Sequence, residues 1–430
     1  MNKFLTFIFL SIFSMSAFAD EINGANTAWI LTATALVLFM TLPGLALFYG
    51  GLVRSKNILS ILMQCFAIAG IASIVWVVVG YSIAFDTSNG NPYFGGFSNV
   101  LFANIGEDTL SGDIPESLFA LFQMTFAIIT PALIIGGFAE RTKFSAVLLF
   151  STLWMILVYA PVTHWVWSSE GWLFKMGLLD FAGGTVVHIT AGVAALVAAI
   201  MIGPRRDFGK SAVKPHNLTM TVTGAGMLWV GWFGFNGGSA LAADGNASMA
   251  MLVTHISAAV GAMTWMLIEW IKYGKPTALG TVTGMVAGLG TITPASGFVG
   301  PAGALVIGFL AGIVCFNATL LIKQKFKIDD SLDVFPVHGV GGILGTLLAG
   351  IFASTQLGVF SGQGFADGIS SISEQLTVQA IGVGATFLYT LIATVIIFII
   401  VRMITGIRCD GDTETQGLDI VEHEERGYTL

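Results

Sequence analysis

Eleven apolar segments, each about twenty residues long, follow one another along this chain and determine its fold class. They lie at roughly 27–49, 58–82, 116–138, 144–165, 182–202, 218–240, 248–270, 277–296, 300–322, 336–355 and 376–404. A helix needs about 20 apolar residues to cross the hydrocarbon core of a bilayer. Because lipid cannot pair with backbone N–H and C=O groups, separate segments can span it only as helices. The sequence therefore predicts an all-α polytopic membrane protein with eleven transmembrane helices.

The composition agrees with this class and excludes one kind of partner. Only 10% of the residues are charged and 55% are hydrophobic, whereas a soluble domain is about 25% charged. The 53 glycines suit helices that pack closely in lipid. The net charge of −7 comes without a basic stripe, so no nucleic-acid partner is expected.

The first 19 residues predict a signal peptide rather than another span. Lys3 precedes an apolar run at 4–13, and Ala17-Phe18-Ala19 has the pattern of a cleavage site. The run is also too short to cross a bilayer comfortably. We expect a mature membrane domain at 20–404, followed by a C-terminal tail at 405–430.

Basic residues mark every second loop between the apolar segments. They follow the odd-numbered segments, as Arg54 and Arg141 do, whereas the intervening loops contain only Lys175. Cytoplasmic loops carry the excess of Lys and Arg. The N-terminus is therefore predicted to lie outside the cell and the C-terminus in the cytoplasm.

The first five segments share features with the next five. The first ends with Phe48-Tyr49-Gly50-Gly51 and the sixth with Phe235-Asn236-Gly237-Gly238, and the fifth and tenth both begin with an Asp-x7-His pattern. Five is an odd number, so the two halves must run in opposite directions. The pattern predicts a five-plus-five inverted repeat, at about 27–202 and 218–355, with its site near the membrane midplane and a last helix at about 376–404.

Two histidines lie inside these apolar segments. His188 follows Asp180 by eight residues, and His338 follows Asp330 by the same interval. Eight helical residues rise about 12 Å, so helices entering a core of about 30 Å from opposite sides bring the two rings to similar depth. An ionisable side chain at that depth indicates a functional site, and we predict that the rings meet.

Paired neutral imidazoles can share one N–H···N hydrogen bond. Such a pair could pass a neutral solute or relay a proton. A metal site would need a third ligand, and no His-x3-His or Cys pair supplies one, so neither a metal nor a cofactor is expected. Asp180 is predicted to cap its helix by accepting the N–H groups of Gly183 or Gly184.

Aromatic residues are placed where they could hold a cation. Phe122 and Phe126 share one face of the third segment, Trp167 ends the fourth, and Phe235 precedes Ser239 by four residues. Rings at such positions usually pack in the core or face lipid. A cation over aromatic faces nevertheless gains about 0.5–2 kcal/mol, and a serine hydroxyl beside it can accept a hydrogen bond, which a potassium ion cannot donate.

Taken together, these stretches resemble the ammonium transporter family (Amt/Mep/Rh), on the bacterial side. The resemblance covers nearly the whole mature chain and rests on residues 38–51, 180–188, 214–217, 231–236, 333–339 and 417–419. It implies eleven helices in a homotrimer with one pore per subunit. Retention of Trp167 and Ser239 resembles the Amt branch.

The resemblance also implies roles for individual residues. Those roles are an outer ammonium-binding site at Phe126, Trp167 and Ser239, a gate of Phe126 and Phe235, paired pore histidines His188 and His338, pore-proximal positions Trp232 and Thr293, and an aspartate, Asp180, that organises the outer site. A cytosolic PII signalling protein is implied as a partner and the bacterial inner membrane as the location.

We therefore expect a transporter, not an enzyme. It would bind NH₄⁺ outside, deprotonate it and conduct NH₃ past the histidines, with the proton relayed separately. A passive ammonia gas channel is the nearest alternative. An ammonium sensor acting through the tail is another, although no signalling domain is attached to residues 405–430. An intramembrane enzyme is disfavoured because metal-ligand spacings are missing.

Overall fold

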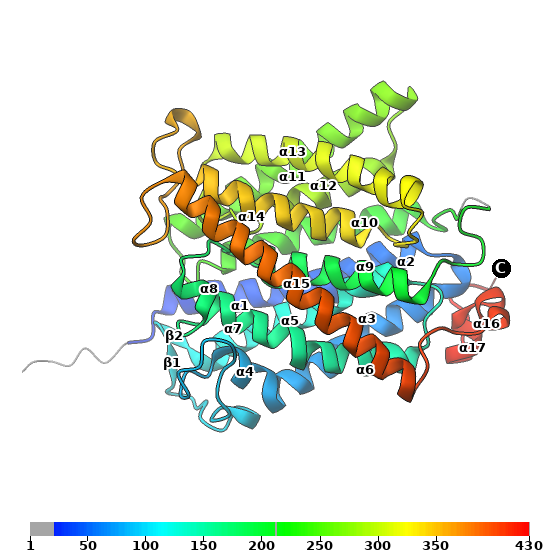
Figure 1. The fold of residues 1–430 in the computed structure, drawn as a ribbon, viewed down its shortest axis with the longest axis horizontal. Helices are drawn as coiled ribbons and strands as arrows, with labels where there is room; N and C mark the ends of the chain where they lie inside the picture. The colour runs from blue at the N-terminus through cyan, green and yellow to red at the C-terminus, as the bar shows by residue number, and fades with distance from the viewer. Residues whose placement is uncertain (1–20, 211–212, 430) are drawn as a thin grey trace, which may run out of the picture.

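The computed structural model describes residues 21–210 and 213–429, so the predicted signal peptide at 1–19 lies outside the described residues. Among the described residues, ten helical spans are long and apolar enough to cross a membrane, and α12 is a shorter apolar helix. These spans run alternately in opposite directions along one axis (Figure 1). The prediction of an all-α polytopic membrane protein with eleven membrane helices is confirmed.

The bounds of the elements follow the predicted segments closely. The first five spans are α1 (Gly24–Phe39), η1 (Met40–Leu45) and α2 (Ala46–Leu52); η2 (Ser55–Asn57), α3 (Ile58–Val75), η3 (Trp76–Gly80) and α4 (Tyr81–Phe85); α5 (Glu116–Phe138); α6 (Phe144–Trp154), η5 (Met155–Tyr159) and α7 (Ala160–Trp167); and η6 (Gly184–Ile189) with α9 (Thr190–Ile202). The next five are α10 (Leu218–Trp232) with η7 (Phe233–Gly237); α11 (Gly245–Tyr273); α12 (Ala278–Ile292); α13 (Pro301–Leu320) with η8 (Leu321–Lys325); and η9 (Phe335–Gly339) with α14 (Val340–Phe352). The last span is α15 (Ile372–Ile404).

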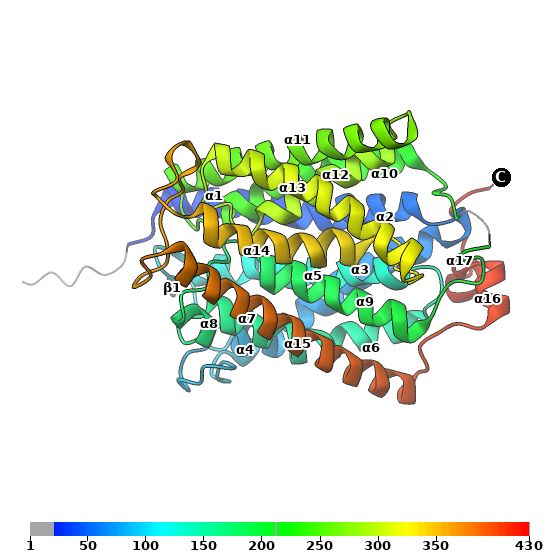
Figure 2. The ribbon, with the colours of Figure 1, turned by 45° about the horizontal axis from the view of Figure 1, so that its top comes forward.

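The two ends of the bundle differ in their connecting segments. One end, here called the hairpin end, carries η4 (Val100–Phe102), β1 (Leu110–Ser111), β2 (Ile114–Pro115), α8 (Trp172–Lys175) and η10 (Gly358–Phe360). The opposite end, here called the tail end, carries α16 (Gly411–Gln416) and α17 (Leu418–His423). Figures 1 and 2 show these two groups at opposite ends of the bundle. α1 begins at the hairpin end and α15 finishes at the tail end.

The hairpin is a small departure from the all-helical expectation. Strands β1 and β2 pair antiparallel, with Ser111 opposite Ile114. Gly112 lies between them at φ 61°, a left-handed conformation that two-residue hairpin turns require. The carboxylate of Asp113 accepts a hydrogen bond from Asn26 at 2.6 Å and so ties the hairpin to α1.

The eighth span ends earlier than its apolar sequence suggests. The predicted segment reached 296, but α12 ends at Ile292. Thr293 still has helical backbone angles, φ −50° and ψ −49°, but Pro294 after it has no N–H with which to continue the helical hydrogen bonds. The chain therefore turns inside the protein, where the Pro294 carbonyl accepts the N–H of Phe181 at 3.1 Å.

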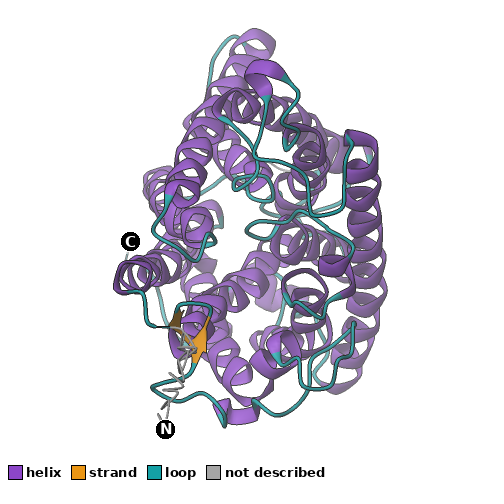
Figure 3. Ribbon diagram, turned by 90° about the vertical axis from the view of Figure 1, so that its left-hand side faces the viewer, coloured by secondary structure: helices purple, strands orange, loops and turns teal. Residues whose placement is uncertain are grey.

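Helices α5 and α15 show where the core and the lipid-facing surface lie. In α5, 94% of the most apolar stretch is buried, whereas in α15 the figure is 28%. Helix α15 runs obliquely across the front of the bundle in Figure 1, and Figure 3 views the helices end-on from the hairpin end. Its exposed Leu388, Ile392 and Ile396 recur every four residues and form one apolar stripe, as expected of a face in contact with lipid.

Several spans are interrupted by wide π-helical turns. Among the described residues these turns are η1, η3, η5, η6, η7, η8 and η9. Such turns are rare and are frequently found at functional sites. Three of them carry predicted site residues: η6 holds His188, η7 holds Phe235 and η9 holds His338.

The fifth and tenth spans have the same construction, as the inverted repeat requires. Each consists of a wide turn followed by a 13-residue helix, α9 in one half and α14 in the other. Each helix packs against the wide turn of the other span. A Cβ atom added to Gly192 would collide with the backbone of Gly339, and one added to Gly342 would lie 2.8 Å from the Gly184 carbonyl. The two spans can cross this closely because glycines occupy the crossing.

A buried ionic network closes the tail end. Arg205 pairs with Asp329 through two guanidinium nitrogens, at 2.8 and 2.9 Å, and with Glu140 at 2.8 Å. Glu140 also accepts the Nε–H of Arg54 at 3.0 Å. Burial by itself would raise the pKa of Glu140, but Arg205 and Arg54 hold that pKa below its ordinary value. The network links the loops that follow α2, α5, α9 and η8.

We predict that Arg205→Met destabilises the protein by about 3–5 kcal/mol, because it leaves two buried carboxylates without their main partner. Thermal unfolding in detergent would measure the loss. The control is Lys175→Met, which breaks an exposed pair with Glu170 and should cost no more than about 1 kcal/mol. Equal losses in the two variants would contradict a structural role for the network.

Candidate functional site

The two predicted histidines meet where the fifth and tenth spans cross. The Nδ1 atoms of His188 and His338 are 3.1 Å apart, and the ring planes are inclined by 17°. A hydrogen bond between two ring nitrogens needs one of them protonated and the other bare. The Nε2 atom of His188 is buried and has no hydrogen-bond partner among the described residues. The pair thus leaves a ring nitrogen available to a small polar molecule.

A carboxylate determines the conformation of the turn that carries His188. Asp180 is 6% exposed and accepts the backbone N–H groups of Gly183, Gly184 and Thr185 at 2.8, 2.6 and 2.8 Å. Gly183 has φ 111°, which a residue with a Cβ atom rarely adopts. The geometry matches the expected helix cap. It extends that expectation, because one carboxylate satisfies several free N–H groups of η6 at once.

Trp232 forms a wall against the first imidazole. Its ring is stacked on His188, with centroids 5.6 Å apart and planes at 15°. Its Nε1–H donates to the hydroxyl of Thr293 at 2.8 Å, and that hydroxyl donates to the Leu289 carbonyl at 2.8 Å. Thr293 is fully buried. Its place in the structure is therefore behind Trp232, where it holds the indole ring in position.

Two phenylalanines close the path between the histidines and the hairpin end. The ring centroids of Phe126 and Phe235 are 4.2 Å apart and the planes are inclined by 33°. Both side chains are 1% exposed. Phe235 also contacts His188, with 6.3 Å between centroids. Phe122 packs edge-on against Phe126. The closed contact means that a solute can pass only when these rings move.

Trp167 and Ser239 lie on the hairpin-end side of this pair and are partly exposed. The Trp167 ring meets Phe126 edge-on, at 5.7 Å and 89°, and its Nε1–H donates to the Asp180 carbonyl at 2.9 Å. The Ser239 hydroxyl donates to the Phe235 carbonyl at 2.8 Å. Because this donor is already used, the hydroxyl can offer a ligand only its oxygen lone pairs. The arrangement suits a species that donates hydrogen bonds.

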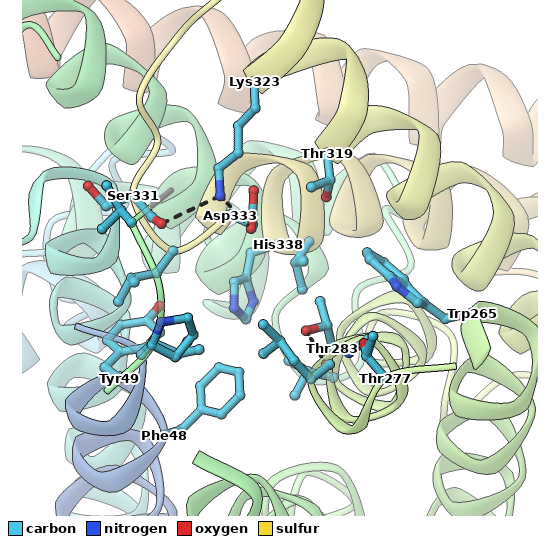
Figure 4. Close-up of a pocket in the computed structure, with 18 of the residues that line it drawn as sticks. Phe48, Tyr49, Trp265, Thr277, Thr283, Thr319, Lys323, Ser331, Asp333 and His338 are labelled. Atoms are coloured by element: carbon cyan, nitrogen blue, oxygen red, sulfur yellow. Dashed lines mark hydrogen bonds and ion pairs between the residues drawn. The ribbon is translucent and has the colours of Figure 1, made fainter. Parts of the chain in front are cut away.

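Two adjoining cavities continue from the phenylalanines towards the tail end. The first is narrow, with about 10 Å³ open to the centre of a water-sized molecule, which is room for about one such molecule. No side chain with a fixed charge lines it; the lining is Met40, Leu45, Phe48, Ile129, Leu133, Val187, His188, Leu228, Trp232, Phe235, Val286 and His338. The second is an open vestibule of about 420 Å³, drawn in Figure 4. Phe48, Val286 and His338 line both cavities.

Apart from His338, sequence reasoning did not identify the residues around the vestibule as lining a cavity. Phe48 and Tyr49 line it from α2, Lys323 from η8 and Asp333 from the chain before η9, as Figure 4 shows around His338. Lys323 pairs with Asp333 at 2.7 Å. Phe48 and Tyr49 belong to the stretch that marked the internal repeat, so a signal was present. It gave no indication of which helix face lines a cavity.

Asp330 in the second repeat is equivalent to Asp180 in the first, because each lies eight residues before the histidine of its repeat. It is fully buried, and its Oδ2 accepts the N–H of Phe335 at 2.7 Å. Its Oδ1 has no partner among the described residues. Burial and the neighbouring Asp333 raise the pKa of Asp330 to about 7. The carboxyl is therefore an ionisable group whose charge the folded protein tolerates poorly.

We predict that Asp330→Asn becomes more stabilising as the pH rises from 5 to 8.5. The folded pKa of about 7 lies above the unfolded value of about 3.9. Between these values the unfolded state loses its proton first, so the contribution of Asp330 to folding is lost as the pH rises. An amide avoids this loss, and its oxygen can still accept the N–H of Phe335.

Melting temperatures of the variant and the wild type across this pH range would test the prediction. The control is Asp410→Asn, because hydrogen bonds to Thr413 lower the pKa of Asp410, and its stability difference should not change above pH 5. A constant difference for Asp330→Asn would contradict the raised pKa.

The fold and the site together define a class of protein. It is a polytopic helical membrane protein with a narrow apolar path, closed by phenylalanines towards one end and lined by paired imidazoles where it opens towards the other. Within the described residues, no group of three or more His, Cys, Asp and Glu side chains could hold a metal ion.

Comparisons with known proteins agree with this class. The model of the "Ammonium Transporter Family" matches residues 28–428. An ammonium transporter of Bacillus subtilis is 47% identical over 405 residues, covering 94% of this chain and 98% of its own. One of Aquifex aeolicus is 45% identical over 429 residues, with 98% of each chain covered. The chain belongs to the ammonium transporter family, and the resemblance noted in the sequence is confirmed.

Solved structures with the same fold support the assignment. Mep2 of Saccharomyces cerevisiae is 38% identical with a TM-score of 0.83, and 91% of each chain is covered. A structure titled "Sensor Amt Protein" is 30% identical with a TM-score of 0.85, covering 93% of this chain and 98% of its own.

Proposed function

We propose that this protein is an ammonium transporter that binds NH₄⁺ at the hairpin end, removes its proton and conducts NH₃ to the tail end. The observation that carries the proposal is the order of the parts along one path. A partly exposed aromatic and hydroxyl site comes first, then two closed phenylalanine rings, then a one-molecule cavity with two imidazoles. Family membership supports ammonium as the substrate.

The binding step uses Phe126, Trp167 and Ser239. The ring planes of Phe126 and Trp167 are nearly perpendicular. A cation held against an aromatic face gains about 0.5–2 kcal/mol. The Ser239 oxygen accepts one N–H of the ion. Asp180 organises this site without touching the substrate: its backbone carbonyl holds the Trp167 indole, while its carboxylate holds the turn below.

The conduction step moves a neutral molecule. Beyond Phe126 and Phe235, the narrow cavity has no charged lining and admits about one small molecule. An intact ammonium ion would have to shed its water there without replacement, which is costly. Ammonia loses far less hydration. It can donate to or accept from the Nε2 atoms of His188 and His338 as it passes.

The paired imidazoles supply a route for the separated proton. A proton added at Nε2 of His188 allows its Nδ1–H to transfer to Nδ1 of His338 across the 3.1 Å contact. His338 then releases its Nε2–H into the vestibule that it lines. The rings return to their starting tautomers when the Nδ1 proton moves back to His188 while the proton on Nε2 of His188 passes, through an ammonia molecule in the narrow cavity that both rings line, to Nε2 of His338. The two transfers run in opposite directions, so this step moves no net charge. Over the whole cycle net charge crosses, although no charged ammonium passes the narrow cavity.

The proposed orientation places the hairpin end outside and the tail end in the cytoplasm of a bacterial inner membrane. Its support is the gathering of Arg54, Arg141, Arg205 and Lys323 at the tail end, since cytoplasmic loops carry the excess of basic residues. The proposal includes removal of residues 1–19 as a signal peptide, a membrane domain to residue 404 and a cytoplasmic tail at 405–430.

The proposed assembly is a homotrimer with one pore in each subunit. A cytosolic PII signalling protein is the proposed regulator, because the basic loop after α9 lines the vestibule and also contacts the tail through Arg206 and Glu414. Blue-native electrophoresis and a binding assay with the host's PII proteins, with and without ATP and 2-oxoglutarate, would test both parts.

Two alternatives remain beside the coupled transporter. A passive ammonia gas channel would use the same cavity without the proton relay. A sensor would signal ammonium binding through the tail, and the 30% identity to the structure titled "Sensor Amt Protein" is the observation in its favour. Growth of a transporter-deficient host on limiting ammonium separates transport from sensing.

We expect an inward positive current when proteoliposomes that contain the protein meet an ammonium pulse. Ammonium uptake would be followed in parallel by internal alkalinisation or acidification. Uptake without current would rule out the coupled mechanism and favour the gas channel. Liposomes without protein are the control for ammonia crossing the lipid itself.

We predict that Trp167→Leu raises the half-saturating ammonium concentration by about 2- to 30-fold, the range that corresponds to losing about 0.5–2 kcal/mol of cation–π attraction. Trp172→Leu is the matched control, because Trp172 lies at the same end of the bundle and packs on Trp165 instead of Phe126. Similar effects in the two variants would argue against recruitment at Trp167.

We also predict that replacing either histidine by aspartate changes selectivity. A carboxylate at His188 or His338 would attract cations with part of their water, so each variant should admit K⁺ or lose transport. Currents with ammonium and with K⁺ measure this. Unchanged selectivity in both His188→Asp and His338→Asp would exclude the proposed role of the pair.

A further inference from the structure

His164 is a buried histidine outside the pore, and both of its ring nitrogens face carbonyl oxygens. It lies in α7 and is fully buried. Its Nδ1 is 3.0 Å from the Ala84 carbonyl, and its Nε2 is 2.8 Å from the Asn91 carbonyl. A carbonyl oxygen can only accept a hydrogen bond. Both contacts are hydrogen bonds only when the ring carries two N–H groups, that is, when it is an imidazolium.

A neutral ring fits the same place less well. It has one N–H, so one bare nitrogen would lie against a carbonyl oxygen, with two lone pairs facing each other. A buried polar group left without its partner costs free energy comparable to a lost hydrogen bond. Hydrogen bonds from a charged donor are also stronger than neutral ones. The contacts around His164 therefore depend on its protonation.

The segment that His164 holds is attached to the α7–α8 region at three consecutive residues. The Asn91 carbonyl accepts from His164, the Pro92 carbonyl accepts from the N–H of Trp172 at 3.1 Å, and the Tyr93 carbonyl accepts from the indole of Trp165 at 2.7 Å. Of these three bonds, only that of His164 changes with protonation. This segment belongs to the long connection between α4 and α5 at the hairpin end.

Helix α7 transmits this attachment to the recruitment site. Trp167 follows His164 by three residues, so the two lie on neighbouring positions of one helical turn. Trp167 in turn packs on Phe126 and donates to the Asp180 carbonyl. A shift of α7 away from the Ala84 and Asn91 carbonyls would move the indole that forms one face of the cation site.

The two carbonyl contacts of the His164 ring are not supplemented by any ionisable side chain among the described residues. The ionisable residues of the elements packed on α7, and of the segment that His164 contacts, are Tyr81 in α4, Glu116 in α5, Tyr159 in η5, Lys175 in α8, His188 in η6, Glu374, Tyr389 and Arg402 in α15, and Asp86 and Tyr93. Among the described residues, none of them makes a hydrogen bond to the His164 ring. Tyr81 donates to Glu116, Lys175 pairs with Glu170, and Asp86 accepts from Ser88.

We propose that protonated His164 is a positioning residue that clamps the α4–α5 connection to α7 and thereby sets the affinity of the ammonium site at Trp167. The clamp rests on the proposed recruitment of ammonium by Trp167. When the ring is neutral, one of its two contacts is lost and α7 is less well held. We therefore expect the affinity for NH₄⁺ to be higher in an acidic than in an alkaline external medium. This difference is separate from the change in the NH₄⁺ to NH₃ ratio with pH.

Transport measurements on the intact protein test the clamp through a comparison that cancels ammonium chemistry. Half-saturating concentrations of wild type and His164→Gln would be measured from pH 5.5 to 8.5. The Gln side chain has no titratable proton. The half-saturating concentration of His164→Gln divided by that of the wild type should be at least about 5 at low pH, the lower end of coupling between linked sites. This ratio should fall towards one at high pH.

The control is His216→Gln. His216 also contacts a carbonyl, that of Val53, but its second nitrogen meets the hydroxyl of Tyr428, which can accept or donate. Its ratio to the wild type should not change with pH. A ratio for His164→Gln that is independent of pH, even if it is large, would mean that His164 is merely structural and would overturn the proposal.

A spectroscopic measurement does not depend on transport or on a folded variant. Ring ¹⁵N chemical shifts of the wild-type protein, with selectively labelled histidine, distinguish imidazolium from the two neutral tautomers. A buried histidine signal with two protonated nitrogens at pH 5.5 that becomes neutral by pH 8.5 supports the clamp. The signal is assigned to His164 if it is missing from the spectrum of His164→Gln. If that variant does not fold, a measured contact between the labelled ring and Ala84 assigns the signal instead.

A neutral ring at pH 5.5, or an imidazolium that persists unchanged to pH 8.5, would refute the clamp as a pH-dependent device. Should the protein prove not to transport ammonium, the ¹⁵N result still decides whether His164 is doubly protonated. Failure of the proposed function and failure of this inference are thus separate outcomes.

Discussion

The contact between the Nδ1 atoms of His188 and His338 constrains the rest of the membrane domain. At 3.1 Å, it requires two spans of opposite direction to cross with their backbones nearly touching. Gly192 and Gly339 meet this requirement, because a Cβ atom on Gly192 would collide with the other span. The wide turns η6 and η9 then direct the rings towards each other. Without this crossing, the narrow cavity would lose the polar groups that distinguish it from ordinary packing.

Asp180 connects this crossing to the hairpin end. One residue holds the turn of His188 through its carboxylate and the indole of Trp167 through its backbone carbonyl. Asp180 therefore connects the proposed cation site to the imidazole pair, and the rings of Phe126 and Phe235 lie between them. His164 extends these contacts outward to the α4–α5 connection. In the proposed mechanism, substrate binding, gating and conduction therefore depend on a few shared buried hydrogen bonds.

Much of the site could be inferred from the chain before its structure was known. His188 and His338 were identified because ionisable groups in apolar segments are costly and conspicuous, and their depth follows from helical rise. The cap formed by Asp180 follows from local chemistry. Phe126, Trp167 and Ser239 came from the family resemblance, because aromatic residues are common in any membrane helix. Phe48 and Val286, which line both cavities together with His338, were missed, since nothing in a single apolar segment shows which face lines a cavity.

Other features escaped because they depend on contacts between distant segments. His164 lies in the fourth apolar segment like any packing residue, and its two carbonyl partners come from another part of the chain. The pKa of Asp330, raised to about 7, results from burial against loops that the sequence places far apart. The early end of α12 at Ile292 was missed although its cause is local, because Pro294 lies only two residues further along the chain.

The sequence by itself determined the number of spans, their two-fold repetition and the meeting of the two histidines, because apolar length and helical rise are local or additive properties. The tertiary structure alone decided which ring faces meet, how narrow the cavity is and which carbonyls surround His164. Those properties depend on distances of a few ångströms between helices, and such distances are settled only when all the side chains pack together.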